Sequence, residues 1–190
     1  MSTAQETYAM LEKQSLWATA TRVHEALAAQ SIPHALVGGM AVCLHGYQRN
    51  TVDIDLLVRS HESESIRVCL QSAGFEWDPL VKEFRKESEA PVQFLVAGDR
   101  AGSGSEVRLP DPGESDTVVV IEGLPVVSLA RLIESKIACG EGSLRRTHKD
   151  FADVVELIAR HNLTGAFVQQ LHKSVRRTYR QLVKHAHGAS

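Results

Sequence analysis

The alternation of apolar and polar residues divides the chain into short segments, most of them helical or extended. Apolar positions three and four residues apart indicate amphipathic helices, whereas short runs of Val, Ile, Leu and Phe between Gly, Pro and polar residues indicate strands. In the first two thirds of the chain this pattern predicts helices over 7–30, 40–45 and 61–73. It predicts strands over 34–37, 52–58, 81–85, 91–97 and 118–121.

The remainder of the chain is a polar loop followed by helices. Residues 98–116 are rich in Gly, Ser, Pro and Asp and are expected to form a loop. Gly123 and Pro125 are expected to turn the chain after its last strand. Helical spacing then predicts helices over 128–139, 146–160 and 164–186.

This order of elements predicts an α+β fold. We expect a small, mixed, twisted sheet with flanking helices on one side, and a C-terminal helical segment. The expected division is an α/β core over 1–125 with the helical segment 126–190 packed on it. A doubly wound dinucleotide-binding fold is disfavoured, because Gly38-Gly39 lacks the spacing of a Rossmann fingerprint or a P-loop.

The composition is that of an ordinary globular protein. Hydrophobic residues make up 43% of the 190 residues, and no apolar run reaches the roughly 18 residues that suggest a membrane-spanning helix. The first residues lack the basic start and apolar stretch of a secretory signal. Cys43, Cys69 and Cys139 are odd in number and lie on apolar helical faces, so we expect reduced thiols. We therefore expect a cytoplasmic protein that does not enter a membrane.

The net charge of −2 conceals an asymmetry along the chain. Residues 1–143 contain 12 Lys/Arg and 20 Asp/Glu, whereas residues 144–190 contain 9 and 3. Most of the basic excess lies in 172–184. Such a segment is either an ordinary solvated helix face or a surface that meets RNA, DNA or an acidic partner.

The most informative chemistry is a pair of acids that follows a pair of glycines. Asp53 and Asp55 are two positions apart in a predicted strand, so both carboxylates project from the same face. Two close carboxylates repel each other unless a cation lies between them, and carboxylate oxygens are ligands that Mg²⁺ prefers. Gly38 and Gly39 lie at a strand-to-helix turn, where free backbone N–H groups can hold phosphate. The arrangement predicts a site for a metal-bound nucleoside triphosphate.

Two stretches of the sequence resemble the DNA-polymerase-β-like nucleotidyltransferase superfamily. That superfamily has a glycine turn, a short helix and an Asp-x-Asp strand, as in the stretch Ala35-Leu36-Val37-Gly38-Gly39-Met40 followed by Thr51-Val52-Asp53-Ile54-Asp55-Leu56-Leu57. The segments 127–136 and 145–154 also resemble the helical tail of bacterial nucleotidyltransferase-like proteins, including relatives of abortive-infection type IV toxins.

The resemblance implies that the protein transfers a nucleoside monophosphate from a nucleoside triphosphate to a hydroxyl acceptor. Asp53 and Asp55 would be the catalytic residues and would hold Mg²⁺ or Mn²⁺, while Gly38 and Gly39 bind the triphosphate. Arg49 is expected to contact a phosphate or the nucleotide, or else to be a surface arginine. The acceptor implied is RNA (tRNA in the toxin relatives), a protein or a small molecule.

The role of Lys136 has two interpretations. It matches a lysine near the site of the toxin relatives and is expected to face a phosphate, or else to be a helical lysine without a role.

Two positions depart from the superfamily pattern. Met40 stands where a serine is common, and Gln93 stands where active members have a third carboxylate. A glutamine offers a carbonyl oxygen but neither a negative charge nor a base. Asp99, Glu83 or Asp150 could supply the missing acid, although Asp150 could instead pair with a nearby arginine or lysine. The alternative function is therefore a non-catalytic binding or regulatory module of the same fold, in a toxin–antitoxin or phage-defence system.

Overall fold

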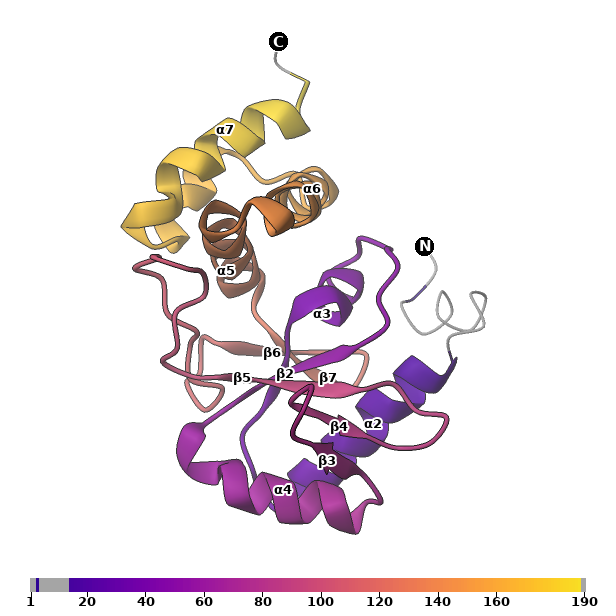
Figure 1. Cartoon of the computed structure of the whole chain (residues 1–190). Coiled ribbons are helices and arrows are strands. Elements are labelled where there is room, and N and C mark those ends of the chain that lie inside the picture. Colours follow the sequence, from indigo (N-terminus) through magenta and orange to yellow (C-terminus); the bar gives the residue numbers. More distant parts are fainter. Residues whose placement is uncertain (1–2, 4–13, 189–190) are drawn as a thin grey trace.

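The computed structural model describes residue 3 and residues 14–188. Its centre is a mixed sheet of seven strands in the order β3-β4-β5-β2-β1-β7-β6 (Figure 1). The strands are β1 (Ala35–Leu36), β2 (Ile54–Val58), β3 (Glu76–Asp78), β4 (Glu83–Arg85), β5 (Val92–Val96), β6 (Val118–Ile121) and β7 (Leu124–Val127). β2 runs parallel to β5 and β1 parallel to β7, while the other neighbouring pairs are antiparallel. The expectation of a mixed α+β fold is confirmed.

Helices cover both faces of the sheet, not one as the sequence suggested. In Figure 1, α2 (Gln14–Ala29) and α4 (Ser63–Ser72) lie below the sheet, while α3 (Gly38–Leu44) and α5 (Leu129–Gly142) lie above it. The reason is visible in β2, where Leu56 and Leu57 are adjacent, point to opposite faces and are both buried. A strand that is apolar on both sides needs a cover on each side.

The C-terminal helices stack above α3 and the sheet (Figure 1). α5 is followed by α6 (Leu144–Arg160) and, after two short 3-10 segments, by α7 (Arg176–Ala186). The single helix expected over 164–186 is therefore wrong, because Leu171 and His172 are extended and separate the 3-10 segments Gly165–Gln170 and Lys173–Val175. The extended residues allow the chain to turn, so that α7 packs on α6.

Two strands were missed by the sequence pattern. β3 is a three-residue edge strand whose burial does not alternate, so it carried no periodic signal. β7 contains Pro125, which the sequence suggested as a turn residue. Proline is tolerated there because β1 is so short that it pairs with β7 only through Val126. The expected domain boundary at residue 125 falls within β7.

The N-terminal helix, the cysteines and the length of the helices can also be compared with the sequence. Residues 7–13 of the helix expected over 7–30 lie outside the described residues. From Gln14 onward, α2 confirms the expected helix. The three cysteines are free thiols. No helix within residues 14–188 has the length and apolar character required to cross a bilayer.

Candidate active site

The two acids and the glycine turn lie directly against each other. Gly38 begins α3 with a φ of 61°, a left-handed conformation that glycine adopts without a steric penalty. Beside it, the N–H of Val37 donates to the carbonyl oxygen of Asp55 at 3.0 Å. A Cβ added to Gly38 would collide with the carboxylate of Asp55. Only a residue without a side chain therefore allows this approach, which leaves bare backbone facing an acid.

Asp55 is destabilised as an anion in this position. Burial, followed by the neighbouring charge of Asp53, raises the pKa of Asp55 above its usual value, and Arg146, Lys136 and Lys149 partly oppose the shift. A divalent cation between Asp53 and Asp55 would relieve both causes. Mg²⁺ is commonly held by one or two carboxylates together with substrate phosphates and water, and these two side chains fit that donor set. Residues 14–188 contain no cluster of three or more acidic, His or Cys side chains arranged to hold a metal, so the substrate would have to complete the coordination.

Arg49 and Thr51 line the other side of the glycine turn. A Cβ added to Gly39 would lie 2.5 Å from the Thr51 hydroxyl and 2.8 Å from an Nη atom of Arg49. The Thr51 hydroxyl donates to an oxygen of Asp53 at 3.1 Å, which orients that carboxylate. The guanidinium of Arg49 therefore lies where a phosphate on the glycine turn could meet it.

A buried network of charges supports the site from the C-terminal helices. The ammonium of Lys136 on α5 lies 3.0 Å from a carboxylate oxygen of Asp150 and 2.7 Å from one of Asp153, both on α6. Asp150 also pairs with Arg146 at 3.1 Å, and Asp153 pairs with Nε of Arg49 at 3.0 Å. Both contacts of Asp153 are short, but neither has hydrogen-bond geometry. Nε of Arg49 and the Asp153 oxygen that faces Lys136 have no hydrogen-bond partner among the described residues. The two contacts are therefore electrostatic, and they hold Arg49 beside the glycine turn.

Gln93 stands next to Asp55 on the neighbouring strand. It lies opposite Asp55 in the parallel pair β2–β5 and opposite Glu83 in the antiparallel pair β4–β5. Its amide nitrogen donates to a carboxylate oxygen of Glu83 at 2.5 Å. The other Glu83 oxygen accepts from Arg85 at 2.9 and 3.1 Å. Glu83, Gln93 and Asp55 thus form a row on one face of the sheet.

Glu83, Asp99 and Asp150 are the three acids that could replace the missing third carboxylate, and the structure places them in three different environments. Glu83 joins the row beside Gln93, whereas Asp99 is exposed in the turn after β5. Asp150 is engaged by Lys136 and Arg146, which matches the ion-pair interpretation. Met40 is fully buried in the hydrophobic core.

The predicted site residues therefore converge on one region. Gly38, Gly39, Asp53, Asp55 and Arg49 meet at the start of α3, with Gln93 in the adjoining strand. Lys136 and Asp150 lie behind this group in the buried network. Sequence reasoning missed Thr51 as a partner of Asp53, and Asp153 as the partner of Arg49. The one available signal was the spacing of Asp150 and Asp153, which places both on one face of a helix.

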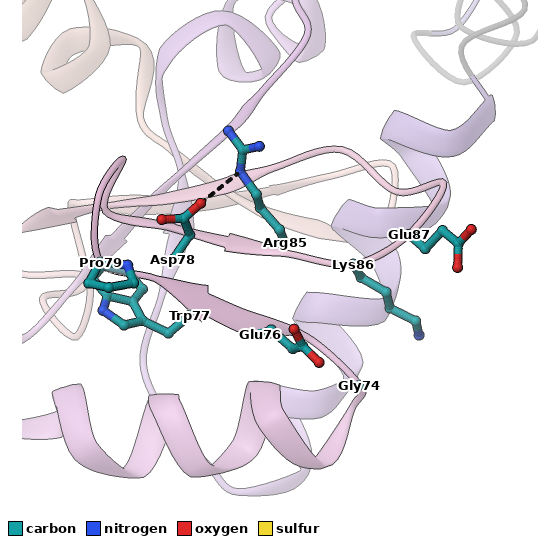
Figure 2. Close-up of a pocket in the computed structure, with 8 residues that line it drawn as sticks. All are labelled: Gly74, Glu76, Trp77, Asp78, Pro79, Arg85, Lys86 and Glu87. Atoms are coloured by element: carbon teal, nitrogen blue, oxygen red, sulfur yellow. Dashed lines mark ion pairs between the residues drawn. The ribbon is translucent and has the colours of Figure 1, made fainter.

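A cavity of about 750 Å³ lies elsewhere, at the β3 edge of the sheet (Figure 2). Figure 2 shows Arg85 and Asp78 pointing toward each other, 4.0 Å apart, at its margin. Its lining consists of Gly74, Glu76, Trp77, Asp78, Pro79, Arg85, Lys86 and Glu87. None of the predicted site residues is among them, so we do not assign the nucleotide to this cavity.

Comparison with known proteins identifies the fold. No family model matches the sequence, and no curated protein matches it. Among solved structures, ANT(2″)-Ia in complex with adenylyl-2″-tobramycin superposes with a TM-score of 0.55 at 16% identity, covering 85% of this chain and 94% of that one. An antigenic nucleotidyltransferase-like protein from Paracoccidioides brasiliensis gives 0.54 at 18% identity, with 93% of each chain covered. JHP933 from Helicobacter pylori gives 0.50 at 17% identity, covering 88% of this chain and 75% of that one. The seven-stranded mixed sheet and these similarities show that the chain has the nucleotidyltransferase fold.

Proposed function

We propose that the protein is a metal-dependent nucleotidyltransferase that moves a nucleoside monophosphate from a nucleoside triphosphate to a hydroxyl group. The observation that carries this proposal is the contact between the bare backbone at Gly38 and the carboxylate of Asp55, with Asp53 beside it. This contact places groups that suit a divalent cation next to groups that suit a phosphate. The nucleotidyltransferase fold supports the same activity.

Each side chain has a definite part in this proposal. Asp53 and Asp55 hold Mg²⁺ or Mn²⁺, which when bound neutralises the phosphates and activates the attacking oxygen. The N–H groups of Gly38 and Gly39 bind phosphate oxygens, and Arg49 contacts the same triphosphate. Lys136, Arg146 and Lys149 add positive potential around Asp55.

The transfer is a single displacement at phosphorus. The acceptor oxygen forms a bond to the α-phosphorus, the bond to the β-phosphate oxygen breaks, and pyrophosphate leaves. The hydroxyl proton passes to a carboxylate. Glu83 is the candidate for this step, because the sheet register places it beside Gln93 and Asp55.

Release of labelled pyrophosphate tests the proposal directly. The purified protein is incubated with Mg²⁺, each of four ribonucleoside triphosphates labelled at the γ-phosphate, and separate pools of RNA, protein and small-molecule acceptors. Asp53→Asn and Asp55→Asn should lower the rate by about 10²–10³-fold or more. Asp99→Asn is the matched control, because Asp99 is an exposed acid outside the site. Absence of pyrophosphate release with every pool would remove the proposed activity.

A binding or regulatory module is the second candidate, and Gln93 is the observation that favours it. The residue beside Asp55 is a neutral amide, which cannot accept a proton or neutralise a second cation. Calorimetry with each triphosphate and Mg²⁺ distinguishes the two candidates, because a binding or regulatory module should bind the triphosphate without turning it over. Activity that appears on Gln93→Asp would support the module.

The acceptor and the setting are also proposals. ANT(2″)-Ia was solved with adenylyl-2″-tobramycin, so amino-sugar hydroxyls belong in the small-molecule pool. We retain RNA and protein hydroxyls as acceptors. A cytoplasmic role in a toxin–antitoxin or phage-defence pair is the setting we propose, and co-purification with an antitoxin-like partner would test it.

A further inference from the structure

The last part of the chain carries a row of cations with no acids among them. After Glu156 the sequence contains no Asp or Glu but six Lys/Arg residues. Four of these cations follow one another along one side of α7 and the turn before it, at intervals of four, three and four residues: Lys173, Arg177, Arg180 and Lys184. Residues at this spacing share a helix face. We call these four residues the α7 basic row.

The basic row is exposed and almost free of partners. All four side chains are exposed. Within the described residues, Arg177, Arg180 and Lys184 have no ion pair, and Lys173 has a single contact with Glu106 at 4.0 Å, with both side chains largely in solvent. Such a pair contributes little. An ordinary solvated helix face mixes both signs and forms pairs three or four residues apart, which this helix does not.

The opposite side of α7 is occupied by the protein itself. Val175, Tyr179 and Leu182 are buried in the hydrophobic core. The helix therefore has no apolar face with which to enter a bilayer. None of the large hydrophobic side chains exposed in the described residues lies on α7, so the row lacks the apolar centre that protein interfaces commonly have. A phosphate backbone needs only positive charge at regular intervals.

We propose that the α7 basic row binds the phosphate backbone of a nucleic acid. From Arg177 to Lys184 the helix rises about 10 Å, so the row presents charges to several consecutive phosphates. α7 packs on α6, whose first turns carry Arg146 and Lys149 close enough to influence Asp55. α7 thus lies on the same side of the sheet as α3, where the candidate site begins (Figure 1). As a binding surface it is independent of the proposed transfer; as the place where an acceptor docks it rests on that proposal.

Salt-dependent binding tests the surface. The probes are fluorescein-labelled single-stranded RNA, an RNA hairpin and a DNA duplex, followed by anisotropy without nucleotide or metal. If all four cations meet phosphates, the slope of log K against log salt is about −3.6 for a duplex and about −2.8 for a single strand. Between 50 and 200 mM salt the affinity for a duplex then falls about 150-fold. The RNA and DNA arms show which backbone is preferred.

Matched variants locate the surface. The quadruple change Lys173→Gln, Arg177→Gln, Arg180→Gln and Lys184→Gln should abolish binding, and Arg177→Gln alone should reduce the slope by about one. Arg177→Lys keeps the charge and should keep the slope. Arg22→Gln with Arg67→Gln is the control, because these exposed arginines lie on α2 and α4, below the sheet.

Four results would overturn the inference. The first three are no binding to any probe, equal binding by the quadruple variant, and equal weakening by the control pair, which would indicate only net charge. Poly-glutamate that competes as well as RNA would also overturn it, because the surface would then be a general anion binder. None of these binding experiments measures pyrophosphate release. A failure of nucleic-acid binding therefore does not contradict the proposed transfer, and a failure of the transfer does not contradict the proposed binding surface.

Discussion

Gly38→Ala tests the central contact of the candidate site. Two separate costs apply to this change. The φ of 61° at Gly38 disfavours any residue with a Cβ, by about 1–2 kcal/mol. The added Cβ would also collide with the carboxylate of Asp55, and forcing a side chain into a filled space costs about 1–3 kcal/mol. The free energy of unfolding should therefore fall by about 2–5 kcal/mol.

Gly104→Ala is the matched control for this change. Gly104 has a φ of 72° and nothing within 4 Å of an added Cβ, so it carries the backbone cost alone, about 1–2 kcal/mol. The difference between the two variants, measured by urea denaturation, isolates the collision. Gly38→Ala made in an Asp55→Gly background should cost no more than Gly104→Ala, because both the carboxylate and the Cβ of Asp55, which lies 2.9 Å from the added Cβ, are gone. The resulting coupling energy is about 1–3 kcal/mol.

The functional readout follows from the same geometry. Calorimetry with ATP and Mg²⁺ should show binding to Gly104→Ala and greatly weakened binding to Gly38→Ala, since Asp55 must move to make room for the methyl group. If the two alanine variants were equally stable and uncoupled to Asp55, the close approach of the glycine turn to the acid would be refuted. The proposed site would then have lost its main support.

The remaining predictions concern the buried charge network around Lys136, the pH dependence of stability, and the sheet residues Glu83 and Gln93. Lys136→Met leaves two buried carboxylates without their shared cation and should lower the free energy of unfolding by about 3–5 kcal/mol, whereas Lys149→Met, at an exposed position, should change it by less than about 0.5 kcal/mol. Burial lowers the pKa of His45 below 6.5, so the stability it supports is complete above pH 6.5 and is lost as the pH falls from there toward the lowered pKa. His45→Gln should reduce, but not remove, the pH dependence of urea unfolding in that range, because burial also lowers the pKa of His34. Glu83→Gln should reduce turnover by about 10²–10⁴-fold with little effect on nucleotide binding, and adding Gln93→Asp should restore part of it.

Each of these has a result that contradicts its reasoning. Equal stability of the Lys136 and Lys149 variants would mean that the buried pairs contribute nothing net. An unchanged pH profile in His45→Gln would assign the acid sensitivity to other groups. Full turnover in Glu83→Gln would leave the proton with another acceptor.

Most of the sheet could be predicted from the sequence, because its central strands are apolar runs bounded by turn residues. β2 and β5 follow this pattern directly, and their parallel pairing places Gln93 beside Asp55. β7 could not be predicted, because a proline inside a four-residue run normally indicates a turn. Its place next to β1 depends on long-range packing, which local patterns do not encode.

The candidate site likewise has a part that local sequence patterns predict and a part that depends on contacts between distant segments. Asp53, Asp55, Gly38 and Gly39 lie close together in the sequence, and the conformational freedom of glycine explains the turn at Gly38. The expectation that both acids lie in one strand is wrong for Asp53, because β2 begins only at Ile54. The partner of Arg49 is Asp153, far along the chain, and no spacing rule connects them. Glu83 was one of several candidate acids until the strand register placed it beside Gln93.

The charge network bears on why a helical tail follows a nucleotidyltransferase sheet. The glycines begin α3, Asp55 lies on β2 and Asp53 directly precedes that strand, but the cations that influence Asp55 come from α5 and α6. Asp153 on α6 also holds Arg49, which belongs to the loop before β2, and the strand β7 that leads into α5 lies inside the sheet next to β1. The helical segment therefore completes the electrostatics of the site, and a core cut at residue 125 would retain the carboxylates while losing the positive charges arranged around them.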